Sequence, residues 1–468
     1  MKRRGFALSV VLVAAVMDLL DGTIGNIVLP SIQGDLHATN ASTAWIASGY
    51  TLSLGTLLTI GGRIGDRYGP RTVLLFGGGG FLLASLACGA APSAGVLIAA
   101  RVVQGAMSAL VVPQALALIQ VMYPAGERGR VLSLFAIVTG LASVSAPPVG
   151  ALLAEADVYG LGWRVVFLVN LPLGLFVLAG TRALPGGQRA AAEPIDLRSV
   201  AWAALGLAGL MGALIQGSEA GRPWWTWPTV ALCAALLAAF GARERTRSLR
   251  NVPVLVDTRL FRHRGFRGAV LVSALVFASV FGFFFTFTLY LQRGLHRDAL
   301  TAALTVLPWT LGIPLTSTPG SRWLVPRYGR RVLEGGVAVL AIGLAGLLHA
   351  LGTHQTGPGT ARLGAWLLTA GCGMGLIIAP VLSLGLAEVP ERLAGTASGL
   401  INNVQQLAGA LGTAVISTVY FAGLTAATPE PVDATRAFHR ATGCVLALCC
   451  AAAFAIRLFP SRTTDGCR

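Results

Sequence analysis

The chain has 468 residues, of which 54% are hydrophobic and only 12% are charged, and its net charge is +16. This balance excludes a soluble domain of this size and predicts a polytopic membrane protein. The positive charges lie between apolar runs, which argues against a nucleic-acid-binding surface. The seven cysteines form no CxxC pair, so neither a disulfide framework nor a metal site is expected.

Apolar runs long enough to cross a bilayer, at about 20 residues each, recur along the chain. They predict fourteen spans, at residues 6–29, 43–60, 72–91, 95–121, 131–154, 163–182, 199–217, 225–242, 268–291, 299–321, 332–352, 362–386, 395–424 and 437–459. The first run follows a basic Met-Lys-Arg-Arg start but lacks a small-residue cleavage site, so it is predicted to remain as a helix. Trp224, Trp225 and Trp227, between the seventh and eighth spans, predict an interfacial belt.

Basic residues are distributed unevenly among the segments between the spans. With the N-terminus in the cytoplasm, the internal segments hold most of the 35 Lys and Arg residues, as the positive-inside rule requires. We therefore expect a multi-pass protein of the plasma membrane with both termini in the cytoplasm. The densest basic run, Arg243 to Arg267, is expected to lie against anionic lipid of the bilayer rather than to bind nucleic acid.

An internal repeat divides the chain. GGRIGDRYGPRTVLL after the second span resembles GSRWLVPRYGRRVLE after the tenth, and YPAGERGRVLS before the fifth resembles VPERLAGTASG before the thirteenth. Repeats at matching places predict two six-helix bundles. We expect an N-terminal bundle in residues 1–183, cytoplasmic linkers with two inserted transmembrane helices in residues 184–260, and a C-terminal bundle with a short tail in residues 261–468.

The first span carries two carboxylates, Asp18 and Asp21, which are three residues apart and therefore share one helix face. An ionised Asp inside a membrane costs about 2.5 to 3.5 kcal/mol even on the lenient insertion scale, so such residues face the bundle interior and mark ion pathways. Arg101 lies well inside the fourth span and needs an anionic partner or a wet cavity. Moving an Arg–carboxylate pair apart would change the proton affinity of the carboxyl group, although such a pair can also be purely structural.

Other residues in the spans leave two interpretations open. Asp18 either takes part in proton coupling or recognises cations. Asn26 and the thirteenth-span cluster of Asn402, Asn403, Gln405 and Gln406 either line a substrate cavity or hydrogen-bond between helices. Pro147 and Pro148 predict a hinge or a tolerated bend in the fifth span.

Four sequence motifs lie in or directly after the predicted spans of the first half of the chain. The segment after the second span contains the glycines and charges of a G-x-L-a-D-r-x-G-r-k signature, namely Gly62, Gly65, Asp66, Arg67, Gly69 and Arg71. LDGTIGNIVLP in the first span contains Asp21 and Asn26, and ARVVQGAMSA in the fourth contains Arg101, Gln104 and Gly105. ASVSAPPVGA in the fifth retains Pro147 and Gly150 of a g-x-x-x-G-P-x-x-G-G motif. On these motifs the chain resembles the major facilitator superfamily and, within it, the drug:proton antiporters with fourteen spanning helices.

The resemblance implies an all-α major facilitator fold and a function. It implies a proton-coupled secondary active transporter that exports small lipophilic or cationic drugs by alternating access, works as a monomer and uses no cofactor besides the coupling proton. Asp21, Arg101 and Asp18 are the expected proton-coupling residues. Gating is expected from the signature after the second span together with Gly105, Pro147 and Gly150, and the cavity is expected to include Asn26, Gln104, Asn402 and Gln405.

Other functions are open or disfavoured on specific grounds. A proton-coupled transporter of a specific metabolite, peptide or siderophore is the alternative. Direct ATP hydrolysis is not indicated, because no GxxxxGK[ST] loop occurs. An enzyme is not expected, since the spans contain no His and acid cluster and no Ser/His/Asp arrangement.

Overall fold

The computed structural model describes residues 2–186, 196–219, 223–250, 252, 254–352, 360–424 and 431–459, which form helices and no strand. The α-helices are α1 (Lys2–Ile27), α2 (Leu29–Asp35), α3 (Asn40–Tyr68), α4 (Pro70–Gly89), α5 (Ala94–Met122), α6 (Ala125–Glu155), α7 (Val165–Leu168), α8 (Asn170–Gly180), α9 (Leu197–Glu219), α10 (Thr226–Leu249), α11 (Arg264–Leu289), α12 (Ala299–Pro319), α13 (Val325–Tyr328), α14 (Arg331–Gly352), α15 (Thr360–Leu386), α16 (Glu391–Ala422) and α17 (Pro431–Ala455). Shorter helical turns are η1 (Val158–Gly160), η2 (Gly162–Arg164), η3 (Thr181–Ala183), η4 (Thr258–Arg262), η5 (Tyr290–Gly294), η6 (Gly320–Leu324) and η7 (Ile456–Leu458).

Thirteen helical segments among the described residues are long and apolar enough to cross a membrane. Each coincides with one of the fourteen spans predicted from the sequence. The remaining predicted span lies in α3, which has 29 residues but falls outside the thirteen. Its many hydroxyl and glycine residues lower its mean hydropathy. α3 packs more extensively against α5 than against any other helix.

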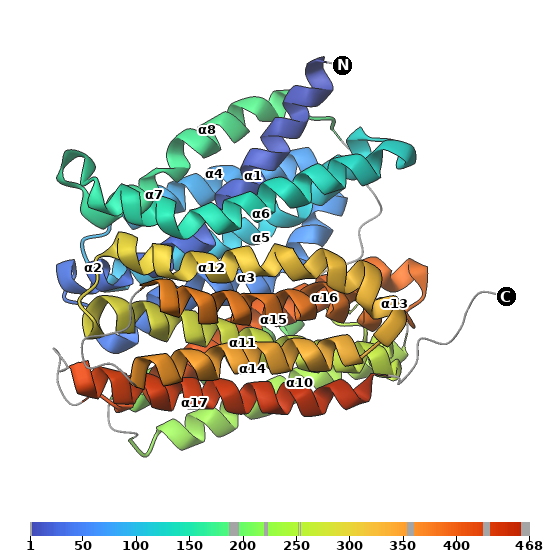
Figure 1. Ribbon diagram of the computed structural model, residues 1–468. Coiled ribbons are helices and arrows are strands. Elements are labelled where there is room, and N and C mark those ends of the chain that lie inside the picture. The colour runs from blue at the N-terminus through green and yellow to red at the C-terminus, as the bar shows by residue number, and fades with distance from the viewer. Residues whose placement is uncertain are drawn as a thin grey trace. The chain divides into compact units, whose positions relative to one another are not determined.

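The chain forms two compact units, Met1–Leu255 and Val256–Arg468. In the first unit α5 packs against α3 and α4, and α1 packs against α6 and α8 (Figure 1). In the second unit the same relations recur in the same chain order, because α15 packs against α12 and α14, and α11 packs against α16 and α17. The predicted repeat of six helices is thus present in both units, and α9 and α10 pack against each other within the first unit, with α9 on α3.

The repeated Arg-Tyr-Gly sequence forms the same kind of turn in each unit. Gly69 ends α3 with a φ of +87°, and its N–H donates to the Gly65 carbonyl. Gly329 ends α13 with a φ of +55°, and its N–H donates to the Val325 carbonyl. Residues with a side chain rarely adopt a positive φ, so both turns require the glycine that the sequence repeat retains.

Glycines bring the backbones of α3 and α5 into contact. A Cβ atom at Gly105 would lie 2.2 Å from the Tyr50 carbonyl oxygen, and one at Gly61 would lie 1.8 Å from the Ala109 carbonyl oxygen. In the second unit, Gly371 of α15 has the same relation to the Trp309 carbonyl oxygen of α12, at 2.1 Å. Close approach of this kind is how small residues pack helices inside membranes, and in the first unit it fixes Tyr50 beside α5.

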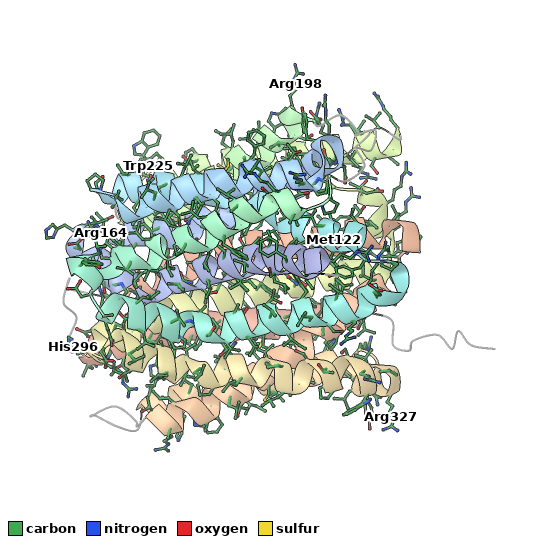
Figure 2. The ribbon with its side chains drawn as sticks, turned by 90° about the horizontal axis from the view of Figure 1, so that it is seen from above. Met122, Arg164, Arg198, Trp225, His296 and Arg327 are labelled. Carbon is green, nitrogen blue, oxygen red and sulfur yellow. The ribbon has the colours of Figure 1, made fainter. Side chains whose placement is uncertain are left out.

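Four labelled residues mark the two ends of the long helices in the first unit. In the first unit Arg164 and Trp225 lie at one end of the long helices, whereas Met122 and Arg198 lie toward the other (Figure 2). Trp224 and Trp227 near the start of α10 are 83% and 65% exposed, and their place in an interfacial belt stays a prediction. Residues 220–222 of the turn before them, and Cys467, lie outside the described residues.

Candidate functional site

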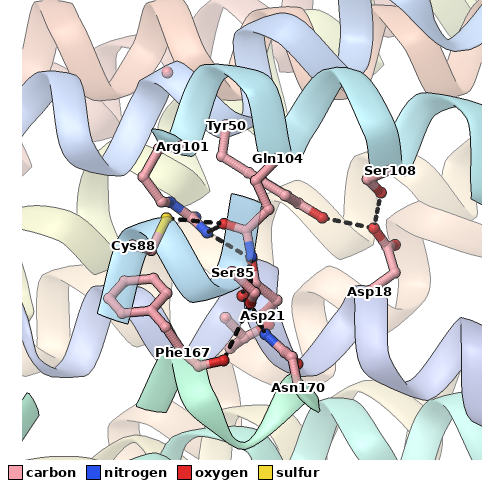
Figure 3. Close-up of polar contacts among 12 residues, drawn as sticks. Asp18, Asp21, Tyr50, Ser85, Cys88, Arg101, Gln104, Ser108, Phe167 and Asn170 are labelled. Atoms are coloured by element: carbon pink, nitrogen blue, oxygen red, sulfur yellow. Dashed lines mark hydrogen bonds and ion pairs between the residues drawn. The ribbon is translucent and has the colours of Figure 1, made fainter. Parts of the chain in front are cut away.

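Asp21 is enclosed in the first unit and forms an ion pair with Arg101. Arg101 Nη1 lies 2.5 Å from Asp21 Oδ2, and each residue is only 3% exposed (Figure 3). Gln104 Nε2 and Asn170 Nδ2 donate to the other carboxylate oxygen, Oδ1, at 2.8 Å and 2.7 Å. The carboxylate therefore has one cationic and two neutral donors, which is the environment that a buried charge requires.

Neutral polar groups connect this ion pair to two further helices. Ser85 Oγ of α4 accepts from Gln104 Nε2 and from Asn170 Nδ2, both at 2.9 Å, and donates to the Phe167 carbonyl of α7 at 3.1 Å. Arg101 Nη1 also donates to Gln104 Oε1 at 2.8 Å. A change of charge at Asp21 would thus alter hydrogen bonds that involve α1, α4, α5 and the start of α8.

Two aromatic rings flank the Arg101 guanidinium. Its central carbon lies 4.4 Å from the centroid of the Tyr50 ring and 5.6 Å from that of Phe167. A cation over an aromatic face is stabilised by about 0.5 to 2 kcal/mol, depending on its desolvation. Arg101 is therefore held by aromatic rings as well as by Asp21, and it keeps favourable contacts when the carboxylate changes its charge.

Asp18 lies one helical turn before Asp21 and has different partners. The Tyr50 hydroxyl donates to Asp18 Oδ1 at 2.6 Å, and the Ser108 hydroxyl donates to the same oxygen. Asp18 is half-buried, whereas Asp21 is buried. Tyr50 thus contacts Asp18 through its hydroxyl and Arg101, the partner of Asp21, through its ring.

The signature residues after the second predicted span lie at the end of α3, in the turn that follows and at the start of α4. A Cβ atom at Gly65 would lie 2.1 Å from Gln114 Oε1, and Gln114 Nε2 donates to the Gly61 carbonyl at 2.9 Å. Asp66 and Arg67 are exposed, and Arg71 is half-buried. The glycines therefore serve close packing and the turn, and the gating role of the charged residues and of Gly62 stays a prediction.

The other predicted residues are dispersed. Gly150 packs α6 onto α1, because a Cβ atom there would lie 2.7 Å from Ile24 Cγ2. α6 continues as one helix through Pro147 and Pro148, so the hinge stays a prediction. Gln104, expected in the cavity, is fully buried with its amide bonded to Asp21 and Ser85. Asn26 and Gln405 are half-buried and Asn402 is exposed.

The sequence analysis missed four members of the site. Tyr50, Ser85, Ser108 and Asn170 bond directly to the two acids or to the amides around them. Their signal is a polar side chain inside an apolar run, as with Asn170 in FLVNLPLG. A search for all such residues on the helices beside α1 would have found them, together with many that have no contact with the acids.

A six-helix repeat in two units, with a carboxylate and a guanidinium paired inside one of them, defines a polytopic membrane protein of the transporter class. The sequence model of the Major Facilitator Superfamily matches residues 11–413. The chain belongs to this superfamily.

Among the relatives of this chain are a probable antibiotic transporter and proteins of antibiotic resistance. The chain is 37% identical over 432 residues to the probable actinorhodin transporter of Streptomyces coelicolor, with 92% of this chain and 75% of that protein covered. It is 35% identical over 422 residues to a puromycin resistance protein of Streptomyces alboniger, with 89% and 82% covered. The tetracenomycin C resistance and export protein of Streptomyces glaucescens is 32% identical over 416 residues, with 87% and 74% covered.

Solved structures share the fold. A peptide transporter of the POT family in an auto-inhibited form superposes with a TM-score of 0.71 at 15% identity, covering 100% of this chain and 99% of that one. A bacterial homologue of the lysosomal transporter Spinster superposes with a TM-score of 0.70 at 17% identity, covering 99% of both chains. At these identities the likeness concerns the fold alone.

Proposed function

We propose that this protein exports small lipophilic or cationic antibiotics from the cytoplasm in exchange for protons. It works by alternating access in the plasma membrane, as a monomer with both termini in the cytoplasm, and the proton is its coupling ion. The relatives support antibiotic export. The enclosed Asp21 supports proton coupling, because ionisable residues inside membrane spans mark ion pathways and proton relays.

The ion pair between Asp21 and Arg101 is the observation that carries the proposal. Two unit charges about 4 Å apart attract by about 4 kcal/mol at an effective dielectric constant of 20. A proton on Asp21 removes this attraction, while Arg101 retains the Gln104 carbonyl oxygen and the Tyr50 ring. Since Asp21 lies on α1 and Arg101 on α5, protonation weakens the link between these helices and favours a rearrangement by a few kcal/mol.

Ethidium transport in everted membrane vesicles tests this coupling. The wild-type protein is expected to accumulate ethidium when the vesicle interior is acidified, and to stop when a protonophore collapses the gradient. Asp21→Asn should insert normally and lose proton-driven accumulation, because an amide cannot cycle a proton. Glu127→Gln removes an exposed acid at the start of α6 and serves as the matched control. Full proton-driven accumulation by Asp21→Asn would refute the assignment.

The alternative, a proton-coupled transporter of one metabolite, peptide or siderophore, predicts a different substrate profile. Such a protein would carry its own substrate and leave ethidium, puromycin and other unrelated compounds untouched. A susceptibility panel in an efflux-deficient host separates the two functions, since a drug exporter raises the tolerance of the host cells to several unrelated compounds.

A further inference from the structure

A cavity of about 430 Å³ lies in the first unit, and none of its lining residues contacts the ion pair of Asp21 and Arg101. Its volume falls within the range of about 300 to 1,000 Å³ that is typical of pockets for small molecules. The wall comes from the ends of four helices, α3, α5, α9 and α10. Its lining residues include Thr39, Ser42, Trp45, Ile98, Gln216 and Trp225.

The cavity lies at the level where the spans begin and end. The span of α9 ends one residue after Gln216, and the span of α10 begins one residue after Trp225. Trp45 and Ile98 lie in the second turns of α3 and α5, and Trp225 lies at the same end of the long helices as Arg164 (Figure 2). Because the ends of spans mark the surface of the hydrocarbon core, the cavity lies at the depth of the lipid headgroups, where tryptophan is enriched.

Close contacts between helices bound the cavity on its inner side. A Cβ atom at Gly212 of α9 would lie 3.6 Å from Trp45 Cζ2 of α3. One at Gly217 would lie 2.7 Å from Thr226 Cγ2 at the start of α10. Gly212 lies about one turn before Gln216, which is exposed, whereas Trp45 is half-buried. The cavity therefore opens outward from the contact between α9 and α3.

The lining presents hydrogen-bond donors and aromatic rings without charge. Among the described residues no ionisable side chain lines the cavity, and the side chains of Trp45, Gln216 and Trp225 form no hydrogen bond. Ser42 Oγ accepts from Thr39 Oγ1 and keeps its own proton to donate. An indole N–H is a donor only, so its missing partner is an acceptor such as a phosphate or ester oxygen. Aromatic faces attract an ammonium group, and a ligand with net charge would find no counter-charge in this lining.

We propose that this cavity binds the headgroup and glycerol region of a zwitterionic phospholipid, such as phosphatidylethanolamine, from the surrounding bilayer. The phosphate and ester oxygens accept from the two indole N–H groups and from the Gln216 amide, the ammonium group lies against an indole ring, and the acyl chains remain in the bilayer. The lipid thereby joins the inserted helices α9 and α10 to α3 and α5 at their ends. The proposal does not depend on which compound the protein exports.

Native mass spectrometry of the purified, delipidated full chain tests this site. The protein is titrated with phosphatidylethanolamine and, separately, with anionic phosphatidylglycerol of the same acyl chains. The double variant Trp45→Phe with Trp225→Phe keeps both rings and removes both N–H donors, so its affinity for phosphatidylethanolamine should fall about tenfold, because each hydrogen bond contributes about 0.5 to 1.5 kcal/mol. Trp224→Phe is the matched control, since Trp224 is 83% exposed and does not line the cavity. Equal affinity for phosphatidylethanolamine in the double variant and the wild type would overturn the proposal.

Three further measurements separate the lipid from other ligands and from effects on folding. Gln216→Ala changes an exposed residue, so it should leave the thermal stability of the delipidated protein unchanged and weaken phosphatidylethanolamine binding about threefold; wild-type affinity would remove the role of the amide. Phosphatidylglycerol should bind more weakly, and equal binding of the two lipids would refute a zwitterionic site. Ethidium should not displace the lipid, whereas displacement would make the cavity a substrate site and overturn the proposal. Asp21→Asn should bind the lipid as the wild type does, so a failure of the proposed function shows in transport alone.

Discussion

The buried ion pair should behave as one unit in a double-mutant cycle. Arg101→Met leaves Asp21 enclosed with neutral donors only, and an uncompensated buried charge costs about 3 to 5 kcal/mol. Asp21→Asn leaves Arg101 buried among Gln104, Tyr50 and Phe167 at a smaller cost, because the rings and the amide still contact it. The double variant Asp21→Asn with Arg101→Met removes both charges and keeps most of the volume, so its stability should lie near that of the wild type.

Unfolding in mixed micelles titrated with SDS measures these differences. The expected coupling between the two positions is about 3 kcal/mol or more, in the sense that the double variant is much more stable than the sum of the single effects predicts. The pair of Asp35 and Arg164 is the internal control, since its side chains are 46% and 27% exposed and exposed pairs couple by about 1 kcal/mol or less. Additive effects at Asp21 and Arg101, or equal coupling in the two pairs, would refute the reasoning.

Two other predictions concern the close packing of α3 and α5 and the partly exposed ion pair of Asp35 and Arg164. Gly105→Ala places a Cβ atom 2.2 Å from the Tyr50 carbonyl oxygen, so α3 and α5 must separate. We expect the free energy of unfolding to fall by about 1 to 3 kcal/mol and transport to weaken. An unchanged free energy of unfolding would contradict the close packing. The Arg164 guanidinium and the Trp163 indole hold the pKa of the Asp35 carboxyl below its ordinary value of 3.8. Their contact therefore contributes fully above about pH 4 and is lost as the pH falls through the lowered pKa, and the coupling of Asp35 with Arg164, measured at pH 7 and at pH 3, should decrease at the lower pH.

The sequence predicted the charged residues of the site, whose burial costs much free energy, and missed the neutral residues, whose burial costs little. Asp21 and Arg101 are charged residues inside spans, and each needs a partner so strongly that few arrangements are possible; the structure brings them together. Ser85 and Asn170 are neutral, and a hydrogen bond between membrane helices contributes only about 0.6 kcal/mol on average. The sequence does not fix the partners of such residues, because the rotation of each helix is set by packing over its whole length.

The fold could be predicted further than the site. The six-helix repeat was predicted from the lengths of the spans and from the repeated Arg-Tyr-Gly sequence. The packing of α3 with α5 and of α12 with α15 agrees with this prediction. The role of Tyr50 was not predictable, because an aromatic residue in a span is ordinarily a packing residue. The folded structure is needed to bring one side chain into contact with both Asp18 and Arg101.

The most direct test of the central claim is whether substrate movement drives protons through Asp21. Purified protein in liposomes that contain a pH-sensitive dye can be given an outward or an inward ethidium gradient with no initial pH difference. The wild type is predicted to move protons against the direction of ethidium, and Asp21→Asn is predicted to move none while Glu127→Gln matches the wild type. Proton movement of wild-type size in Asp21→Asn, or ethidium movement without protons in the wild type, would contradict the account.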